Sequence, residues 1–245
     1  MKKLLAFAVT IFSVSTAQAA LLGRDINGVA VAGGAPSAVF LYDTVLDITW
    51  LRDANSNGQL TWDQANTWAA QLSVGTYADW RLPAIIANAD ATINYAGGTD
   101  QGTNVRTKSG DPMQYQAGQT VYSEMAHLYY STLGNLAYCT PAGSSATTCG
   151  HQNQTGYGLA HTGDFKNLIS AYYWTGLEHP PLSVAFGFDN SLGFQDLNEK
   201  AARLYALAVR PGDVLTSAVP EPQAWVMTLA GLGLVSGAMR RRKLP

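Results

Sequence analysis

The sequence predicts an α+β fold with a mixed or antiparallel sheet, about two helices and long irregular loops. Short runs of alternating apolar residues, which favour strands, occur at residues 39–51 and again at 171–211. Two other segments, 61–72 and 121–133, repeat their apolar residues at helical spacing. The stretches between these elements are rich in Gly, Asn, Thr and Asp, a composition typical of loops.

The first 19 residues have the composition of a secretory signal peptide rather than of a structural helix. Two lysines open the segment, an apolar run covers residues 4–14, and Ala17-Gln18-Ala19 forms a cleavage site of the small-x-small type. We therefore expect residues 1–19 to be removed and the mature chain to begin at Ala20, after export.

The last 27 residues form a second signal. Val219-Pro220-Glu221-Pro222 is a stiff segment, residues 224–239 form an apolar run suited to a membrane helix, and Arg240-Arg241-Arg242-Lys243 favours the cytoplasmic side. This order of parts at 219–245 resembles the PEP-CTERM sorting tail. The resemblance implies export, transient retention in the membrane and processing by an exosortase. An ordinary C-terminal membrane anchor is the alternative interpretation.

Between these two ends we expect one domain, residues 20–213, with a short linker at 214–218. A body of about 200 residues is long enough to bury a core. Residues 22–38 are small and turn-rich, so we expect the first strand at Val39 and a core that covers about 39–213. A second strand should follow at 46–51, after a tight turn.

A polar loop follows these strands. Its candidate oxygen ligands, spaced as in an EF-hand calcium loop, are Asp53, Asn55, Asn57, Gln59 and Thr61. A calcium ion, the one candidate cofactor, would bind weakly, because a single carboxylate is present and Gln64 occupies the place of the usual bidentate Glu. The alternative is an Asx-rich turn that only caps the next helix.

Two helices are expected. Thr61 and Gln64 match a capping box, and the first helix should end by Gly75. The second should run from about residue 121 to 133, with Gly134 as a left-handed stop. Four further strands are expected at 171–176, 184–188, 193–197 and 204–211.

Two cysteines, Cys139 and Cys149, lie in a polar, Gly-rich excursion at 135–161. An even number of nearby cysteines in an exported chain favours a disulfide. The alternative is a metal site completed by His151 and His161, although the spacing matches no standard zinc pattern.

The charge of the body restricts its partners. Without the six basic residues and one acidic residue of the two ends, the body keeps 9 basic and 16 acidic side chains, a formal charge of −7. This charge argues against nucleic acid as a partner and favours neutral glycans or acidic glycans bridged by cations. Because no motif combines a nucleophile with a base, and no phosphate loop or zinc helix is present, we expect no enzyme.

Five segments resemble, in their order, the Lcl C-terminal domain family, named for a collagen-like bacterial adhesin. They are Asp47–Asp53, Thr61–Ala65, Asp79–Pro83, Tyr173–Thr175 and Tyr205–Asp213. The resemblance implies an extracellular domain comparable with the C-type lectin-like fold, and adhesion or glycan binding. The acidic body departs from the basic surfaces with which adhesive members bind sulfated glycans.

Within these segments the framework residues are Trp50, Trp80, Arg81, Trp174 and Arg210. We expect the tryptophans to lie in the core, with exposed sugar-stacking positions as the alternative, and the two arginines to stack on them while bridging Asp79 or Asp213.

The combined prediction is an exported protein of the cell surface or extracellular matrix, in a Gram-negative-type envelope. Its expected partners are an exosortase, extracellular polysaccharide and, before processing, the membrane. The alternative functions are a lectin-fold enzyme that acts on matrix components and a passive structural protein of the matrix.

Overall fold

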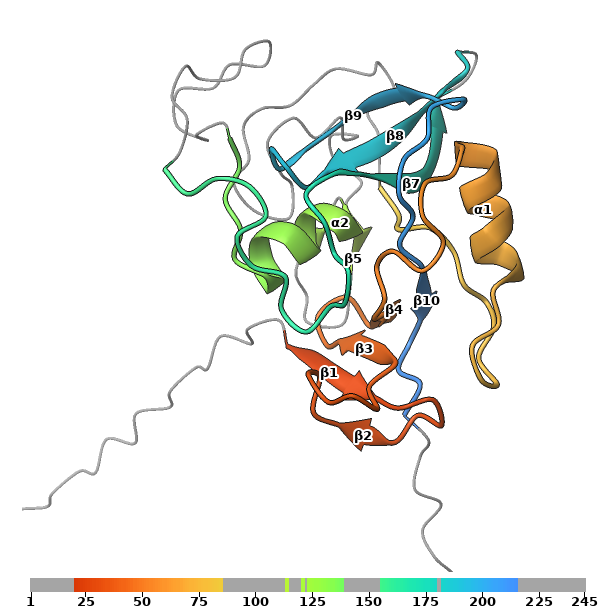
Figure 1. Cartoon of the computed structure of the whole chain (residues 1–245), viewed down its shortest axis with the longest axis vertical. Coiled ribbons are helices and arrows are strands. Elements are labelled where there is room, and N and C mark those ends of the chain that lie inside the picture. The colour runs from red at the N-terminus through yellow and green to blue at the C-terminus, as the bar shows by residue number, and fades with distance from the viewer. Residues whose placement is uncertain are drawn as a thin grey trace, which may run out of the picture. The chain divides into compact units, whose positions relative to one another are not determined.

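The computed structural model describes residues 20–85, 113–114, 120–121, 123–138, 155–179 and 182–215. The chain divides into two units, Met1–Val214 and Leu215–Pro245, and the elements below belong to the first. The described elements are two α-helices, a π-helix that continues the second of them, and antiparallel sheets of five, three and two strands (Figure 1). This arrangement confirms the predicted α+β class.

The larger sheet has five strands in the order β10-β4-β3-β1-β2, and every neighbouring pair is antiparallel. Its strands are β1 (Leu21–Arg24), β2 (Ala30–Val31), β3 (Phe40–Asp43), β4 (Ile48–Leu51) and β10 (Val209–Pro211). The expectation that strands begin at Val39 is wrong, because β1 pairs along its whole length with β3. Pairing across the sheet stabilises β1 although its sequence is short and contains Gly.

The smaller sheet has the order β7-β8-β9 and is also antiparallel. Its strands are β7 (Tyr172–His179), β8 (Val184–Asp189) and β9 (Phe194–Glu199), close to the predicted positions. The pairing of β7 with β8 shifts register between Trp174 and Glu178. The predicted strand at 204–211 is only partly correct, since regular pairing covers β10 alone and residues 204 and 205 form isolated bridges.

Helix α1 (Trp62–Gln71) begins at the predicted capping box. The Thr61 hydroxyl accepts from the N–H of Gln64, and the Gln64 side chain accepts from the N–H of Thr61. The helix ends at Gln71, before the predicted stop, because Leu72 takes an extended conformation. Ala65 and Ala69 form its buried face.

The second predicted helix is short and changes type. Helix α2 (Glu124–Ala126) continues directly as the π-helix η1 (His127–Thr132). Ser123 caps α2 by accepting from the N–H of Ala126 at 3.1 Å. The N–H of Leu133 donates to the carbonyl of Leu128 at 2.9 Å, a spacing of five residues. Gly134 has φ 71°, which agrees with the predicted left-handed stop.

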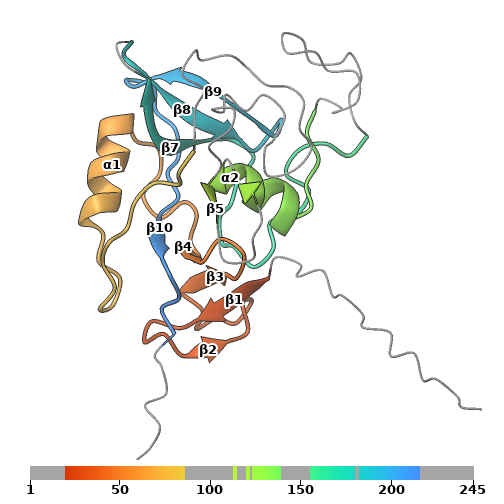
Figure 2. The same ribbon diagram turned by 180° about the vertical axis from the view of Figure 1, so that it is seen from behind.

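The main core lies between the two larger sheets. Figures 1 and 2 show α2 between β7–β9 on one side and β1–β3 on the other, with α1 on the flank beside β7. The core cluster includes Trp50 from β4, Met125 and Tyr129 from the helical segment, and Tyr173 and Phe188 from the smaller sheet. A short pair, β5 (Met113–Gln114) with β6 (Thr120–Val121), completes the described elements.

Candidate functional site

A cavity of about 250 Å³ opens beside α1. The described residues that line it are Asn66, Arg81, Leu82, Ala84, Ile85, Gly176 and Leu177. They come from three places that are distant in sequence: helix α1, residues 81–85 in and after the Trp80-Arg81-Leu82-Pro83 motif, and the irregular middle of β7.

The β7 irregularity forms one wall of the cavity. The register shift between Trp174 and Glu178 interrupts the ladder to β8, and the N–H of Gly176 donates instead to the carbonyl of Pro83 at 2.9 Å. Such an irregularity changes the direction of side chains, as a β-bulge does, and β-bulges are common next to active sites. Here it ties β7 to the segment that carries Arg81.

The guanidinium of Arg81 is held in one orientation. Its Nη1 and Nη2 donate to the two carboxylate oxygens of Glu124, both at 2.7 Å. Glu124 is fully buried, and its Oε2 also accepts from the N–H of Ala84 at 2.6 Å. Such a bidentate pair is directional and charge-assisted. The Arg81 side chain nevertheless remains 39% exposed, so that it presents a fixed positive group to the cavity.

The lining combines two polar groups with apolar walls. Asn66 contributes an amide whose Nδ2 donates to the carbonyl of Trp62 at 3.0 Å, and Arg81 contributes the guanidinium. Leu82, Ile85 and Leu177 supply apolar surface. Fixed donors beside apolar surface can orient a polar ring-shaped ligand. None of the described lining residues carries a carboxylate or an imidazole.

The three framework tryptophans lie in the core. Trp50 and Trp174 are fully buried and Trp80 nearly so, which excludes them as sugar-stacking surfaces. The indole N–H of Trp174 donates to the carbonyl of Leu60 at 2.8 Å, and that of Trp80 to the carbonyl of Tyr77 at 3.1 Å. These bonds show why tryptophan suits the two positions, since each buried N–H finds an acceptor.

The expected partners of the framework arginines are wrong. Arg81 pairs with Glu124 rather than with Asp79. Arg210 lies over the ring of Tyr77, 5.5 Å from its centroid, and its Nε donates to the carbonyl of Ala78 at 3.2 Å.

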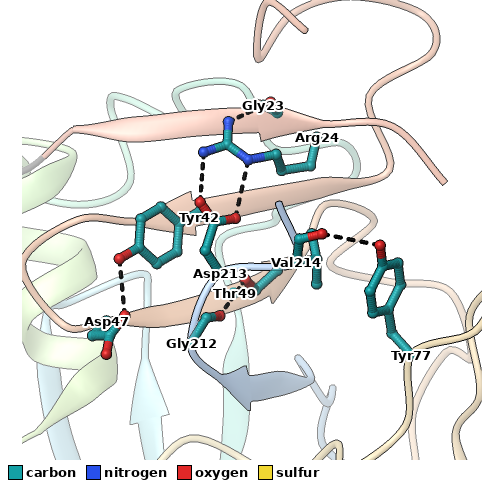
Figure 3. Close-up of polar contacts among 9 residues, drawn as sticks. All are labelled: Gly23, Arg24, Tyr42, Asp47, Thr49, Tyr77, Gly212, Asp213 and Val214. Carbon is teal, nitrogen blue, oxygen red and sulfur yellow. Dashed lines mark hydrogen bonds and ion pairs between the residues drawn. The ribbon is translucent and has the colours of Figure 1, made fainter. Parts of the chain in front are cut away.

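Asp213, the other expected partner, belongs to a network near the end of the body (Figure 3). Its carboxylate accepts from Nε of Arg24 at 3.0 Å and from Nη2 at 2.7 Å. We call this pair, together with the bonds from Thr49 to the Gly212 carbonyl and from Tyr77 to the Val214 carbonyl, the C-terminal clasp. It fastens the chain after β10 to β1 and β4.

Tyr42 lies next to the C-terminal clasp and donates to Asp47 at 2.8 Å (Figure 3). Burial, followed by this hydrogen bond, raises the pKa of Tyr42 to about 12. The phenol is therefore a neutral hydrogen-bond donor at physiological pH, and it helps to fix the turn between β3 and β4.

A buried carboxylate that the sequence did not indicate as special lies at the end of β3. Asp43 is fully buried, and its Oδ1 accepts from the N–H groups of Val45 and Leu46 at 3.0 and 3.1 Å. Burial raises the pKa of Asp43, while these N–H groups and the nearby His127 act in the opposite direction. The neighbouring Trp50 indole also lowers the pKa of this carboxyl. The position marks Asp43 as a structural turn residue.

The predicted cation loop connects β4 to α1. Asp53 Oδ1 accepts from the N–H of Asn55 at 3.1 Å and from Nδ2 of Asn167 at 3.0 Å. Gly58 has φ 67°, the left-handed turn that the sixth position of a calcium loop requires. Thr61 is engaged as the cap of α1, and the Gln59 carbonyl accepts from Arg203 at 3.3 Å.

Several predicted features lie outside the described residues. They are the signal peptide, both cysteines, His151, the sorting motif and the apolar run at 224–239. Among the described residues, no helix is long and apolar enough to cross a membrane. The disulfide and the membrane span therefore stay predictions.

Comparison with known families confirms the tail. Residues 218–243 match the family described as PEP-CTERM protein-sorting motif. The match identifies an exported, exosortase-processed protein of the cell surface or extracellular space in a Gram-negative-type envelope. No curated protein and no solved structure matches the chain. The resemblance of the body to the Lcl C-terminal domain family therefore rests on the order of its motifs alone.

Proposed function

We propose that this exported protein binds extracellular polysaccharide, and that the Arg81 cavity holds one sugar unit of the polymer. The observation that carries the proposal is the guanidinium of Arg81, which Glu124 holds from behind at 2.7 Å while the side chain stays 39% exposed. A donor fixed before the ligand arrives loses little conformational entropy on binding.

The rest of the lining suits a sugar. A pyranose has an apolar C–H face and a rim of hydroxyl groups, and the cavity offers Leu82, Ile85 and Leu177 beside the polar groups of Asn66 and Arg81. The body charge of −7 disfavours a densely sulfated polymer. A neutral glycan, or an acidic glycan with its charge compensated by cations, agrees with both features.

Binding is favoured over the two alternative functions by what lines the cavity. An enzyme that cleaves glycosidic bonds normally needs two carboxyl groups about 5–10 Å apart. The carboxylate of Glu124, which pairs with the lining residue Arg81, is fully buried. A passive matrix protein would need no oriented donor at a cavity. We extend the proposal to the Lcl C-terminal type and a C-type lectin-like fold, supported by the motif order.

A glycan array probed with the mature protein tests the proposal. We expect binding to a limited set of neutral or uronic glycans, and about tenfold weaker binding for Asn66→Ala, the loss of about one hydrogen bond. Thr67→Ala is the matched control, because this exposed neighbour on α1 lies outside the lining. A blank array would favour the passive role. Loss of bound glycan by hydrolysis would favour the enzyme.

A further inference from the structure

The loop between β4 and α1 contains an unusual group of buried atoms. Three buried side-chain atoms of this loop make no hydrogen bond: Asn55 Oδ1, Asn57 Oδ1 and Asn57 Nδ2. Buried polar atoms are normally paired with protein, water or an ion. Two amide oxygens without partners in one loop therefore suggest a bound cation, which such oxygens could coordinate.

The orphaned oxygens share their loop with a carboxylate. Asp53, Asn55 and Asn57 occupy alternate positions, and Gly58 makes the left-handed turn that follows them in calcium loops. The start of the loop is anchored, since the N–H of Ala54 donates to the carbonyl of Lys166 at 2.9 Å. The backbone is therefore held in place before any ion arrives.

A third amide, the fourth candidate ligand, comes from a distant segment. Asn167 takes a left-handed conformation with φ 56°, and its side-chain amide lies 3.0 Å from Asp53 Oδ1. A half-turn of this amide, which exchanges two atoms of nearly equal size, would place its oxygen there instead. Two oxygens about 3 Å apart can both contact a Ca²⁺ ion at the usual 2.3–2.6 Å.

We propose that Asp53, Asn55, Asn57 and Asn167 bind one calcium ion. The site differs from the full spacing pattern, because Thr61 and Gln64 are engaged in the capping box of α1. The described residues contain no group of three or more His, Cys, Asp or Glu that could hold a metal, so this site depends on amide oxygens. Oxygen-only ligands with one carboxylate suit Ca²⁺ at about millimolar affinity, the range of extracellular modules.

Thermal unfolding of the purified full chain tests the site. After treatment with EDTA, about 10 mM CaCl₂ should raise Tm by about 3–6 °C for a millimolar Kd, whereas MgCl₂ at the same concentration, or NaCl at equal ionic strength, should not. Asn57→Ala should abolish this shift. If the Asn57 amide does not contact calcium, Asn57→Ala instead keeps the calcium-dependent rise in Tm.

The matched control is Asp25→Asn in the turn between β1 and β2. Asp25 Oδ1 accepts from the N–H groups of Asn27 and Val29 at 2.9 and 2.8 Å, so this Asx turn is already satisfied. The variant should keep the full calcium shift. A shift that is absent from the wild type, or equal in Asn57→Ala and Asp25→Asn, would overturn the site.

Equilibrium dialysis against radioactive calcium provides a measurement that does not depend on stability. We expect one ion bound per chain and at least tenfold weaker binding for Asp53→Asn, which keeps the size of the side chain and removes its charge. Absence of stoichiometric binding in the wild type would overturn the proposal even where a Tm shift is seen.

Discussion

Two arginine–carboxylate pairs in this body have almost the same geometry and opposite burial. Arg81 and Glu124 meet at 2.7 Å with the acid fully buried and the arginine 39% exposed. Arg24 and Asp213 also meet at 2.7 Å, but here the arginine is 6% exposed and the acid 22%. In each pair one member is anchored in the protein and the other faces outward.

The difference between the pairs shows how burial assigns roles to the same chemical groups. Buried Glu124 acts as the anchor and orients Arg81, whose exposed part lines the cavity. Buried Arg24 is the anchor of the other pair, and Asp213 belongs to the segment after β10 that the C-terminal clasp fastens. A charge removed from water needs its partner more than an exposed charge does, so the two pairs should respond differently when broken.

The largest effect is expected for Arg81→Ala. The substitution leaves the fully buried Glu124 carboxylate without its guanidinium, and breaking a buried pair in this way costs about 3–5 kcal/mol. Urea unfolding of the wild type and the variant measures the difference. Arg81→Lys is the control: it keeps the charge but loses the bidentate geometry, and should cost less. A loss below about 1 kcal/mol for Arg81→Ala would contradict the assigned role of Glu124.

A smaller effect is expected for Asp213→Ala in the C-terminal clasp. Part of the Asp213 carboxylate already faces water, so we expect a loss of about 1–3 kcal/mol from the two hydrogen bonds to Arg24. A double-mutant cycle with Arg24→Ala isolates the pair, and the double variant should lose less than the sum of the single variants. Additive losses would show that the two side chains act independently.

The smallest effect is the pH dependence of Asp43, a buried carboxylate with no arginine among its described partners. Burial raises its pKa in the folded protein above the ordinary value of 3.8, so the folded state binds this proton more tightly than the unfolded chain does. The stabilisation of the folded state by this proton is complete below the pKa of Asp43 in the unfolded chain. It decreases as the pH rises through the higher pKa of Asp43 in the folded protein. Asp43→Asn keeps an oxygen for Val45 and Leu46 and has no such proton.

Urea unfolding at several pH values measures this difference. The free energy of unfolding of the wild type, relative to Asp43→Asn, should rise as the pH is lowered from neutral toward 4. A difference that is independent of pH would show that Asp43 does not titrate with folding.

Local sequence signals predicted the elements that local interactions stabilise. Thr61 and Gln64 are three residues apart, so their capping box is visible in the chain and confirmed in α1. The strand β1 was missed, because pairing with the distant β3 stabilises it rather than an alternating pattern. The π-helix after α2 was also missed, since apolar residues near every third or fourth position do not report a bond that spans five residues.

The candidate site was less predictable than the fold. Arg81 stands in a motif that the sequence indicates as framework, but its partner Glu124 lies 43 residues away and its cavity also needs Asn66 and Leu177. The spacing of Asp53, Asn55 and Asn57 indicates the polar loop in the sequence. The contact of Asp53 with Asn167, in contrast, joins residues that are 114 positions apart. Composition offers no means of pairing residues at such separations.

The sequence by itself determined the sorting tail at 218–243, the α+β class and the capped start of α1, because each depends on residues that are close in the chain. Only the tertiary structure decided which carboxylate each arginine meets, which tryptophans are buried and which amides are left without partners. Those outcomes depend on packing between segments. Two ion pairs of the same short length then differ in which charged side chain is buried and which stays partly exposed.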